Sequence, residues 1–477
     1  MALKFEELLR KIALPKRYFT NNFIIADQYK EEVDAFVALL SQCSGSEFNV
    51  DKQLVIAAKT ATLCETVKQN IEHIINAISF FENADLKSAQ EEFDTLLNSI
   101  KDDIFISTID DWVRIPLGEK TYSTRFRITP GYRYFRVRPV NEICNSISQN
   151  ADELFHIPLS KRAYTNNERF SLAGFPSLYL STMLPLAWQE CGYPSKYYYS
   201  EYQYNYSYDP AFNERLIDNE LRFISLYSPD EICNWGISIK YSNFDLWLEV
   251  IIRYLNVYPL VLACSFVNQS GKVPYKQEYI VPQMLMQWVQ RNNPIVQGIS
   301  YFTCVDTSMW TMHWCAYNLV VPAIPPYDDK MYSCKLREKF CWTKPQFFTV
   351  PIADAEYNKH DRMFVYHLLT DMKSAVRIKH FPTELFELFN KMMNVCSCLM
   401  SLLDNGATQN MQLALHILTS IDDNCRQLKV LPPPLIHRKK PGQVVLAAAD
   451  IVVIAGLVCR TLARMKQSCY NNRKRHR

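Results

Sequence analysis

The stretch that decides the fold is residues 154–190, which read LFHIPLSKRAYTNNERFSLAGFPSLYLSTMLPLAWQE. It contains an arginine (Arg169), a turn around Gly174, a strand-like run from Ser177 to Leu180 and a glutamate (Glu190). Glycine and proline in the turn separate the polar first half from the apolar second half. The stretch therefore predicts one turn–strand–helix unit that carries charged side chains at both ends.

Two further residues complete a possible site. Arg136 lies upstream in the β-rich run 132–138, and Tyr179 lies inside the strand-like run. Guanidinium groups are bidentate, permanently charged donors for a diphosphate, and an aromatic ring stacks beside a leaving group. A fixed carboxylate, here Glu190, stabilises the positive charge that develops on ribose when a glycosidic bond breaks. The pattern predicts a site that binds a dianionic nucleotide and attacks its glycosidic bond.

Each of these residues also has a purely structural interpretation. Arg136 fits an ion pair with an acid on a neighbouring strand, Tyr179 fits a core position, and Glu190 fits a solvated helix surface. His156 and His313 fit packed or hydrogen-bonded positions better than catalytic ones. Spacing alone leaves these alternatives open, because arginines on strands and glutamates on helices are common.

The 477 residues are enough for two or three domains. Residues 1–118 show apolar residues at helical spacing and predict a helical N-terminal domain. Residues 119–330 alternate in the manner of strands and predict an α+β domain. Residues 331–435 predict a helical C-terminal region, with a hairpin between about 385 and 425, and residues 436–477 form a basic apolar tail.

Several elements are expected inside the α+β domain. A tyrosine-rich run at 197–208 alternates with polar residues, so we expect an exposed strand or loop that forms a surface patch, with base stacking as the alternative. The remaining runs predict helices over 243–255 and 281–290, and strands over 124–128, 221–226, 260–266 and 298–303.

Charge and cysteine content narrow the class of protein. From residue 430 onward the chain has ten Lys or Arg against one acid, a charge of +9, so the rest carries −6 of the net +3. A mildly acidic body argues against nucleic-acid binding. The fifteen cysteines are scattered without a CxxC pair, which favours reduced thiols in a cytoplasmic protein and predicts no metal site.

The ends of the chain carry no clear targeting signal. The first twenty residues lack a continuous apolar segment, so we expect no secretory signal. Residues 444–459 form an apolar run that contains Asp450 and is shorter than the roughly 20 residues of a spanning helix. We expect a terminal helix docked on the body, with membrane contact through the tail as the alternative.

The sequence resembles the RES domain in four segments: 135–139, 169–174, 178–180 and 188–190. The resemblance extends from about residue 130 to 325. It implies an ADP-ribosyltransferase-like fold and an enzyme that consumes NAD as its substrate, with no metal, often as the toxin of a bacterial toxin–antitoxin pair. It also implies a protein antitoxin or regulator as partner, and a homo-oligomer is possible.

The resemblance assigns the site residues as well. Arg136 matches the first-strand arginine of the family, Arg169 the turn arginine, Tyr179 the strand tyrosine and Glu190 the catalytic carboxylate. Arg136 and Arg169 are then expected to hold the diphosphate and the adjacent ribose, with Tyr179 at the nicotinamide end. The ADP-ribosyl group would be transferred to water, to phosphate or to a macromolecule.

One departure concerns the serine of the family pattern. No serine precedes the helix that contains Gln283, and Tyr279, Gln283 or Thr303 is expected to supply a hydroxyl or amide in its place. Tyr279 and Gln283 are therefore included among the expected NAD-binding residues. The missing serine also leaves an alternative function open, a catalytically degenerate module that binds nucleotides or a protein partner.

Overall fold

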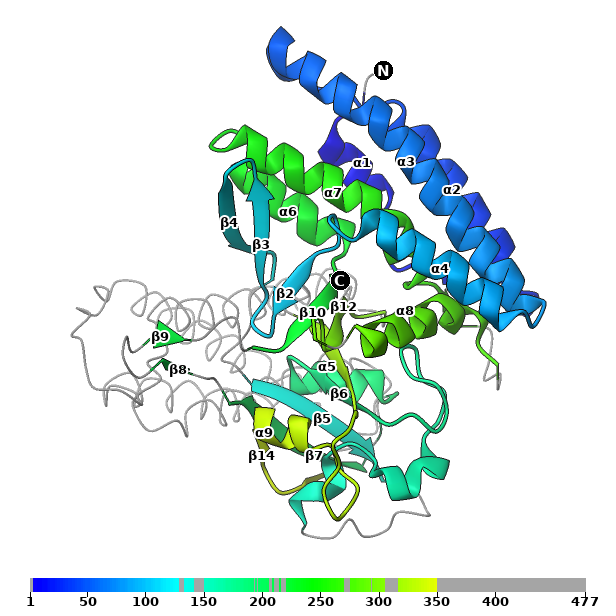
Figure 1. Cartoon of the computed structure of the whole chain (residues 1–477), viewed down its shortest axis with the longest axis vertical. Helices are drawn as coiled ribbons and strands as arrows, with labels where there is room; N and C mark the ends of the chain where they lie inside the picture. Colours follow the sequence, from blue (N-terminus) through cyan, green and yellow to red (C-terminus); the bar gives the residue numbers. More distant parts are fainter. Residues whose placement is uncertain are drawn as a thin grey trace, which may run out of the picture.

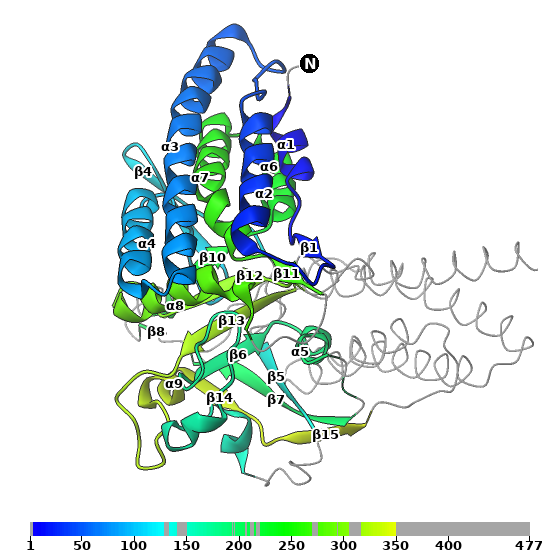
Figure 2. The same cartoon turned by 90° about the vertical axis from the view of Figure 1, so that its right-hand side faces the viewer.

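The computed structural model describes residues 3–127, 133–140, 150–192, 194, 196–205, 208–209, 214–215, 220–269, 275–292, 294–304 and 316–349. Long helices gather at one end of the molecule, and strands with a few short helices form the other end (Figures 1 and 2). The predicted C-terminal hairpin and basic tail, and most of the predicted helical region 331–435, lie outside these residues. The α+β class is confirmed.

Four helices form the first hundred residues: α1 (Phe5–Lys11), α2 (Ile25–Leu40), α3 (Val50–Glu82) and α4 (Leu86–Ile100). The side chains of Asn49 and Asp85 accept hydrogen bonds from backbone N–H groups in the first turns of α3 and α4, which fixes where these helices begin. Their apolar stripes are buried, as the helical spacing predicts.

Three later helices pack against them: α6 (Pro229–Ile239), α7 (Phe244–Ala263) and α8 (Ile280–Arg291). All seven helices contribute to one hydrophobic core that also includes β10 and β12 residues. The division at residue 118 stays a prediction, although it falls in the turn of a β-hairpin. In Figure 2, α7 lies between α3 on one side and α2 on the other.

The expected strand at 260–266 is wrong, because α7 continues through Ala263. The error has a physical reason: a helix buried on all sides carries a continuous apolar run that periodicity cannot distinguish from a buried strand. Among the described residues, α7 alone is long and apolar enough to cross a membrane. Within its most apolar window, 83% of the residues are buried in the core.

An 11-stranded sheet runs through the molecule in the order β14-β7-β5-β6-β13-β12-β10-β2-β3-β4, with β15 also paired to β7. Its pairs are antiparallel except β10 with β12. The strands are β2 (Ile106–Thr108), β3 (Trp112–Leu117), β4 (Lys120–Arg125), β5 (Arg133–Pro139), β6 (Ser177–Ser181), β7 (Lys196–Tyr204), β10 (Arg222–Leu226), β12 (Gly298–Phe302), β13 (Tyr317–Pro322), β14 (Phe340–Trp342) and β15 (Gln346–Thr349).

Short elements connect this framework. Two small pairs lie outside the large sheet, β1 (Arg17–Tyr18) with β11 (Val267–Asn268), and β8 (Tyr208–Asp209) with β9 (Glu214–Arg215). The short helices are α5 (Leu184–Glu190), α9 (Cys334–Lys339), η1 (Ala151–Leu154), η2 (Leu159–Tyr164) and η4 (Gln277–Tyr279). The expected helices at 243–255 and 281–290 and the strands at 221–226 and 298–303 are confirmed. The expected strand at 124–128 is wrong in its bounds: β4 covers Lys120–Arg125, residues 126 and 127 are outside it, and residue 128 lies outside the described residues.

The tyrosine-rich run is not an exposed patch. Most of it forms β7, which lies between β5 on one side and β14 and β15 on the other. Tyr197, Tyr202 and Tyr204 are buried, whereas Gln203 between two of them is exposed. Because successive side chains of a strand point to opposite faces, tyrosine rings are buried on both sides of β7: Tyr197 and Tyr199 pack in one apolar cluster, and Tyr202 and Tyr204 in another. The Tyr202 hydroxyl donates to the Leu154 carbonyl.

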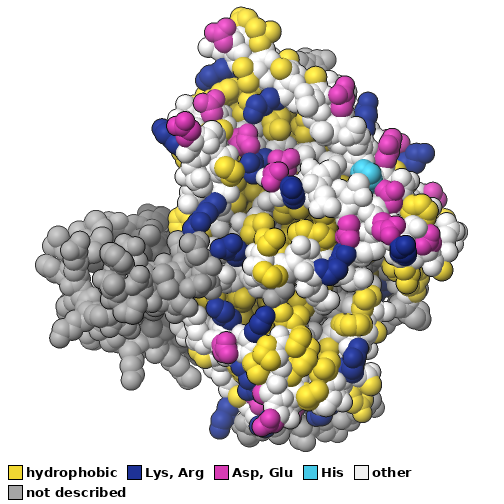
Figure 3. Space-filling view, in the orientation of Figure 1, with side chains coloured by type: hydrophobic (Ala, Val, Ile, Leu, Met, Phe, Trp, Pro, Cys, Tyr) yellow, Lys and Arg dark blue, Asp and Glu magenta, His cyan; other side chains and the backbone are white. Residues whose placement is uncertain are grey.

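Figure 3 shows one face of the molecule with its charged side chains in colour. Lys and Arg side chains are interspersed with Asp and Glu across that face, and no continuous basic stripe crosses its described residues. A stripe of that kind is the usual footprint of a protein that binds a nucleic-acid backbone. The prediction that nucleic acid is not a partner remains a prediction.

Candidate active site

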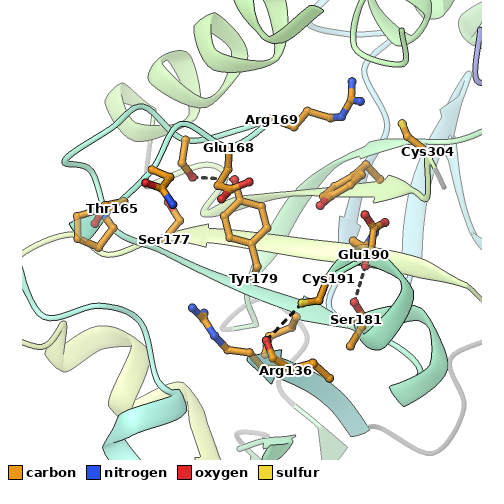
Figure 4. A pocket seen from close by; sticks show the side chains of 18 of the residues that line it. Arg136, Thr165, Glu168, Arg169, Ser177, Tyr179, Ser181, Glu190, Cys191 and Cys304 are labelled. Atoms are coloured by element: carbon orange, nitrogen blue, oxygen red, sulfur yellow. Dashed lines mark hydrogen bonds between the residues drawn. The ribbon is translucent and has the colours of Figure 1, made fainter. Parts of the chain in front are cut away.

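A cavity of about 580 Å³ opens where β5, β6 and α5 face the segment before β6 and the start of α8. Its volume lies in the range of small-molecule sites. Arg136, Arg169, Tyr179, Glu190 and Tyr279 all line it. Figure 4 shows Glu190 and Cys304 on one side of Tyr179, and Arg136, Thr165 and Ser177 on the other. The structure thus brings four residues of the predicted constellation, and Tyr279, to one hollow.

Glu190 is the last residue of α5 and is held by one residue directly after β12 and one residue on β13. Its Oε1 accepts hydrogen bonds from Thr303 Oγ1 (2.7 Å) and Asn318 Nδ2 (2.6 Å). Asn318 is oriented in turn, because Ser181 Oγ donates to its Oδ1 (2.6 Å). Glu190 is exposed to solvent through the cavity that it lines.

Desolvation by the surrounding protein raises the pKa of Glu190. The hydrogen bonds from Thr303 and Asn318 lower it again, as do the nearby charges of Arg169 and Arg17. These donors favour the ionised form, so the carboxylate is held by groups that stabilise its negative charge. Such an arrangement can stabilise a cation that forms opposite it.

Tyr179 lies on β6 and holds the turn before that strand. Its hydroxyl accepts from the Phe170 N–H (3.3 Å) and pairs with Ser171 Oγ (2.7 Å). Burial raises its pKa well above the usual range, so the phenol stays neutral. The ring forms part of the cavity wall between the two arginine positions. Tyr179 is therefore both a structural tie and a candidate stacking surface.

Arg169 belongs to the same turn and is anchored from behind. Its Nη1 donates to the carbonyls of Cys264 (3.1 Å) and Phe266 (2.9 Å), which follow the C-terminal end of α7. The guanidinium lies over the ring of Tyr279, 5.1 Å from its centroid. Carbonyls at a helix C-terminus favour a cation. Arg169 is thus held in place while it lines the cavity.

Arg136 extends from β5 into the other side of the cavity (Figure 4). Its Nη1 is buried and has no hydrogen-bond partner among the described residues, and the same is true of Thr165 Oγ1 nearby on the cavity wall. Burial lowers the pKa of Arg136, yet a guanidinium stays charged at neutral pH. A buried cation with a free donor needs an anion, because an unpaired buried charge is costly.

The residues expected to replace the missing serine have three different surroundings. Thr303 bonds to Glu190. Tyr279 lines the cavity, and Lys276 Nζ donates to its hydroxyl (2.9 Å). Gln283 is outside the residues lining the cavity, and its Nε2 donates to the carbonyl of Glu168 (3.1 Å). Gln283 therefore supports the turn that carries Arg169, and the hydroxyl at the carboxylate belongs to Thr303.

Sequence reasoning missed two polar groups of the site. Asn318 sits in the apolar run of β13, where nothing local distinguishes it from a core position. Glu168 lines the cavity, and its pKa is raised by burial and lowered by Lys276 and Arg136. An isolated polar residue inside a strand of otherwise apolar residues is the one signal that points to Asn318.

The described residues contain no cluster of His, Cys, Asp or Glu that could hold a metal ion.

Comparison with known proteins gives one distant similarity. The chain is 27% identical over 288 residues to the protein named "Putative toxin YopC" from Bacillus subtilis (strain 168). The match covers 57% of this chain and 57% of that protein, so the chain spans little more than half of its relative. No family model and no solved structure matches the chain. The chain is thus a distant relative of a protein whose name describes a toxin.

Proposed function

We propose that this protein is a toxin that binds NAD in the cavity and cleaves the bond between nicotinamide and ribose. The observation that carries the proposal is the convergence of Arg136, Arg169, Tyr179 and Glu190 on one cavity. The resemblance of these residues to the RES pattern names NAD, and with it an ADP-ribosyltransferase-like arrangement. The name of the distant relative supports the toxin role.

The chemistry assigns a task to each side chain. Arg136 and Arg169 hold the diphosphate through their guanidinium donors, and Tyr179 lies against the nicotinamide end. As the C–N bond breaks, its electron pair passes to the nicotinamide ring and leaves positive charge on ribose. Glu190, oriented by its two hydrogen bonds, stabilises that charge. Water, phosphate or a macromolecular nucleophile then attacks the ribose carbon and loses its proton.

The test follows NAD and its products by mass after incubation with purified protein, with and without inorganic phosphate. We expect release of nicotinamide, and the mass of the ribosyl product identifies the acceptor. Glu190→Gln keeps the shape of the side chain but removes its charge, and should lower the rate at least a hundredfold. Arg136→Ala should also abolish NAD loss. Glu119→Gln, on an exposed turn, is the matched control.

A folded Glu190→Gln variant with wild-type NAD loss would rule out this site assignment. The alternative function, a degenerate module that binds nucleotide without turnover, is favoured by the buried, unpartnered donor of Arg136, which calls for an anion whether or not chemistry follows. Tight NAD binding with no product in any condition would establish that alternative.

A further inference from the structure

The N-terminal segment reaches the wall of the cavity. β1 pairs in parallel with β11, and the register places Arg17 opposite Val267, which lines the cavity. Two backbone hydrogen bonds fix this register, from the Val267 N–H to the Lys16 carbonyl (2.9 Å) and from the Gln269 N–H to the Tyr18 carbonyl (2.8 Å). Paired strands lie about 4.8 Å apart, so the backbone of Arg17 is one strand behind the cavity wall.

The neighbours of Arg17 show which way its side chain points. Lys16 Nζ lies 2.8 Å from Glu32 Oε2, and the Tyr18 hydroxyl donates to Glu32 Oε1 (2.9 Å). Both side chains therefore face α2. Successive side chains of a strand point to opposite faces, so Arg17 faces away from α2. Residues directly opposite in a sheet share a face, so the side chain of Arg17 lies on the same face as that of Val267, a residue that lines the cavity.

The electrostatics of Glu190 agree with this direction. The charge of Arg17 lowers the pKa of Glu190, as does that of Arg169. Arg17 is half-buried, and no ion pair joins it to an acid among the described residues. Figure 2 shows β1 and β11 side by side on the flank of the molecule above α5, the helix that ends at Glu190. Arg17 is not among the residues that line the cavity, but its charge acts on Glu190 from behind the cavity wall.

We infer that Arg17 is a further ligand-binding residue of the cavity, supplied by the N-terminal segment, and that it holds an anionic group of the ligand together with Arg169. Its position rests on the strand register and on the directions of the neighbouring Lys16 and Tyr18 side chains, and does not depend on the proposed function. The identity of the anion as the diphosphate of a nucleotide rests on the proposed function. The N-terminal region then completes the site instead of only flanking it, and Arg17 lies outside the part of the chain that resembles the RES domain.

The first test measures binding of ADP-ribose to the full chain by calorimetry. Arg17→Ala should weaken binding about tenfold or more, because a charge-assisted hydrogen bond is lost. Arg17→Lys should recover part of the loss. Lys16→Ala is the matched control, since it removes the same charge from the neighbouring residue, whose side chain faces α2, and it should change binding less than twofold. Thermal melts establish that each variant is folded.

A second test needs no ligand. Cys304 lines the cavity, and the charge of Arg17 acts on its thiol. Its labelling rate is measured with a dianionic disulfide reagent, dithiobis(nitrobenzoate), and with a neutral one, dithiodipyridine, by mass spectrometry of the Cys304 peptide. The same Cys304 thiolate attacks both reagents and releases one reagent thiolate in each case. The pKa of the thiol therefore cancels in the ratio of the two labelling rates, dianionic reagent over neutral reagent, and this ratio reports the electrostatic potential at Cys304.

At low ionic strength, Arg17→Ala should lower this ratio several-fold, whereas Lys16→Ala should leave it unchanged. If Arg17→Ala and Lys16→Ala give the same ratio as the wild type, the placement of Arg17 is overturned. If the ratio falls but wild-type protein binds no ADP-ribose, the placement stands and the nucleotide proposal fails. If ADP-ribose binds equally well to the wild type and Arg17→Ala, its role in binding is overturned.

Discussion

Glu190 shows how single side chains define this site. Burial alone would favour its neutral acid, but Thr303 and Asn318 each donate a hydrogen bond to the same carboxylate oxygen. Hydrogen bonds to the charged form favour that form. The hydroxyl and the amide therefore offset part of the rise in the pKa of Glu190 that burial causes.

Thr303→Val removes one of these donors at nearly constant volume. The pKa of Glu190 should rise further, because the ionised form loses one of its two hydrogen-bond donors. If the reaction needs the carboxylate, the acid limb of the pH–rate profile for NAD consumption should move to higher pH. Thr303→Ser keeps the donor and serves as control. Coincident profiles for all three proteins would contradict this role of Thr303.

At the scale of elements, a buried charge network joins the end of β4 to α6 and β12. Arg127 is 1% exposed; its Nε donates to Glu231 Oε1 (2.7 Å) and its Nη1 to Ser300 Oγ (2.7 Å). Its backbone N–H donates to Asp111 Oδ2 (2.8 Å), and the Tyr227 hydroxyl donates to the other oxygen (2.8 Å). Burial raises the pKa of Asp111 to about 7.

Arg127→Met should therefore destabilise the fold strongly, by about 3–5 kcal/mol, because Glu231 is left buried without its cation. Urea unfolding followed by circular dichroism measures this difference. Arg125→Met, two residues earlier at the end of β4, is the control; Arg125 is exposed over the ring of Trp112, and its replacement should cost less than about 1 kcal/mol. Equal stability of the two variants would show that the network contributes little.

How far the sequence predicts these elements depends on their surroundings. The helices at 25–40 and 86–100 have one buried face each, and their stripes reveal them. The end of α7 is buried on all sides, so its periodicity is lost. In the site, Arg136, Arg169, Tyr179 and Glu190 could be selected by residue type and family likeness. Asn318 could not, because its role comes from a strand pairing with Ser181 that local sequence does not encode.

On the scale of the whole molecule, contacts between distant segments decide the architecture. The Tyr29 hydroxyl donates to the Pro259 carbonyl (3.4 Å), and the Ile25 N–H donates to Gln277 Oε1 (3.0 Å) beside the cavity. Patterns within residues 1–118 predict helices but cannot show which later helix each one packs against. The inclusion of β1 in the site was unpredictable for the same reason.

Global stability should also respond to pH through His156. This buried ring donates from Nδ1 to the Ile157 carbonyl and accepts the Ser333 N–H at Nε2 (2.9 Å each), so it is neutral. Burial lowers its pKa from 6.5 to about 4. Between these values the unfolded chain binds the extra proton, so stability is lost as pH falls from 6.5 towards 4, by about 3 kcal/mol in total.

His156→Gln retains an acceptor for Ser333 but cannot titrate. The difference in unfolding free energy between wild type and this variant should shrink as pH falls through that window, and level off below pH 4. Urea titrations at half-unit pH steps measure it, and the difference between the two proteins cancels the effects of other carboxyl groups. A difference independent of pH would mean that His156 titrates alike in the folded and unfolded chains.

The parallel pairing of β1 with β11 has a consequence for synthesis on the ribosome. Arg17 emerges early, but its partner strand is made about 250 residues later, and the donors Thr303 and Asn318 later still. A nascent chain therefore cannot hold the cavity in working order until most of it has been translated. If the proposed function is correct, activity can begin only after about two thirds of the chain, as far as Asn318, has left the ribosome.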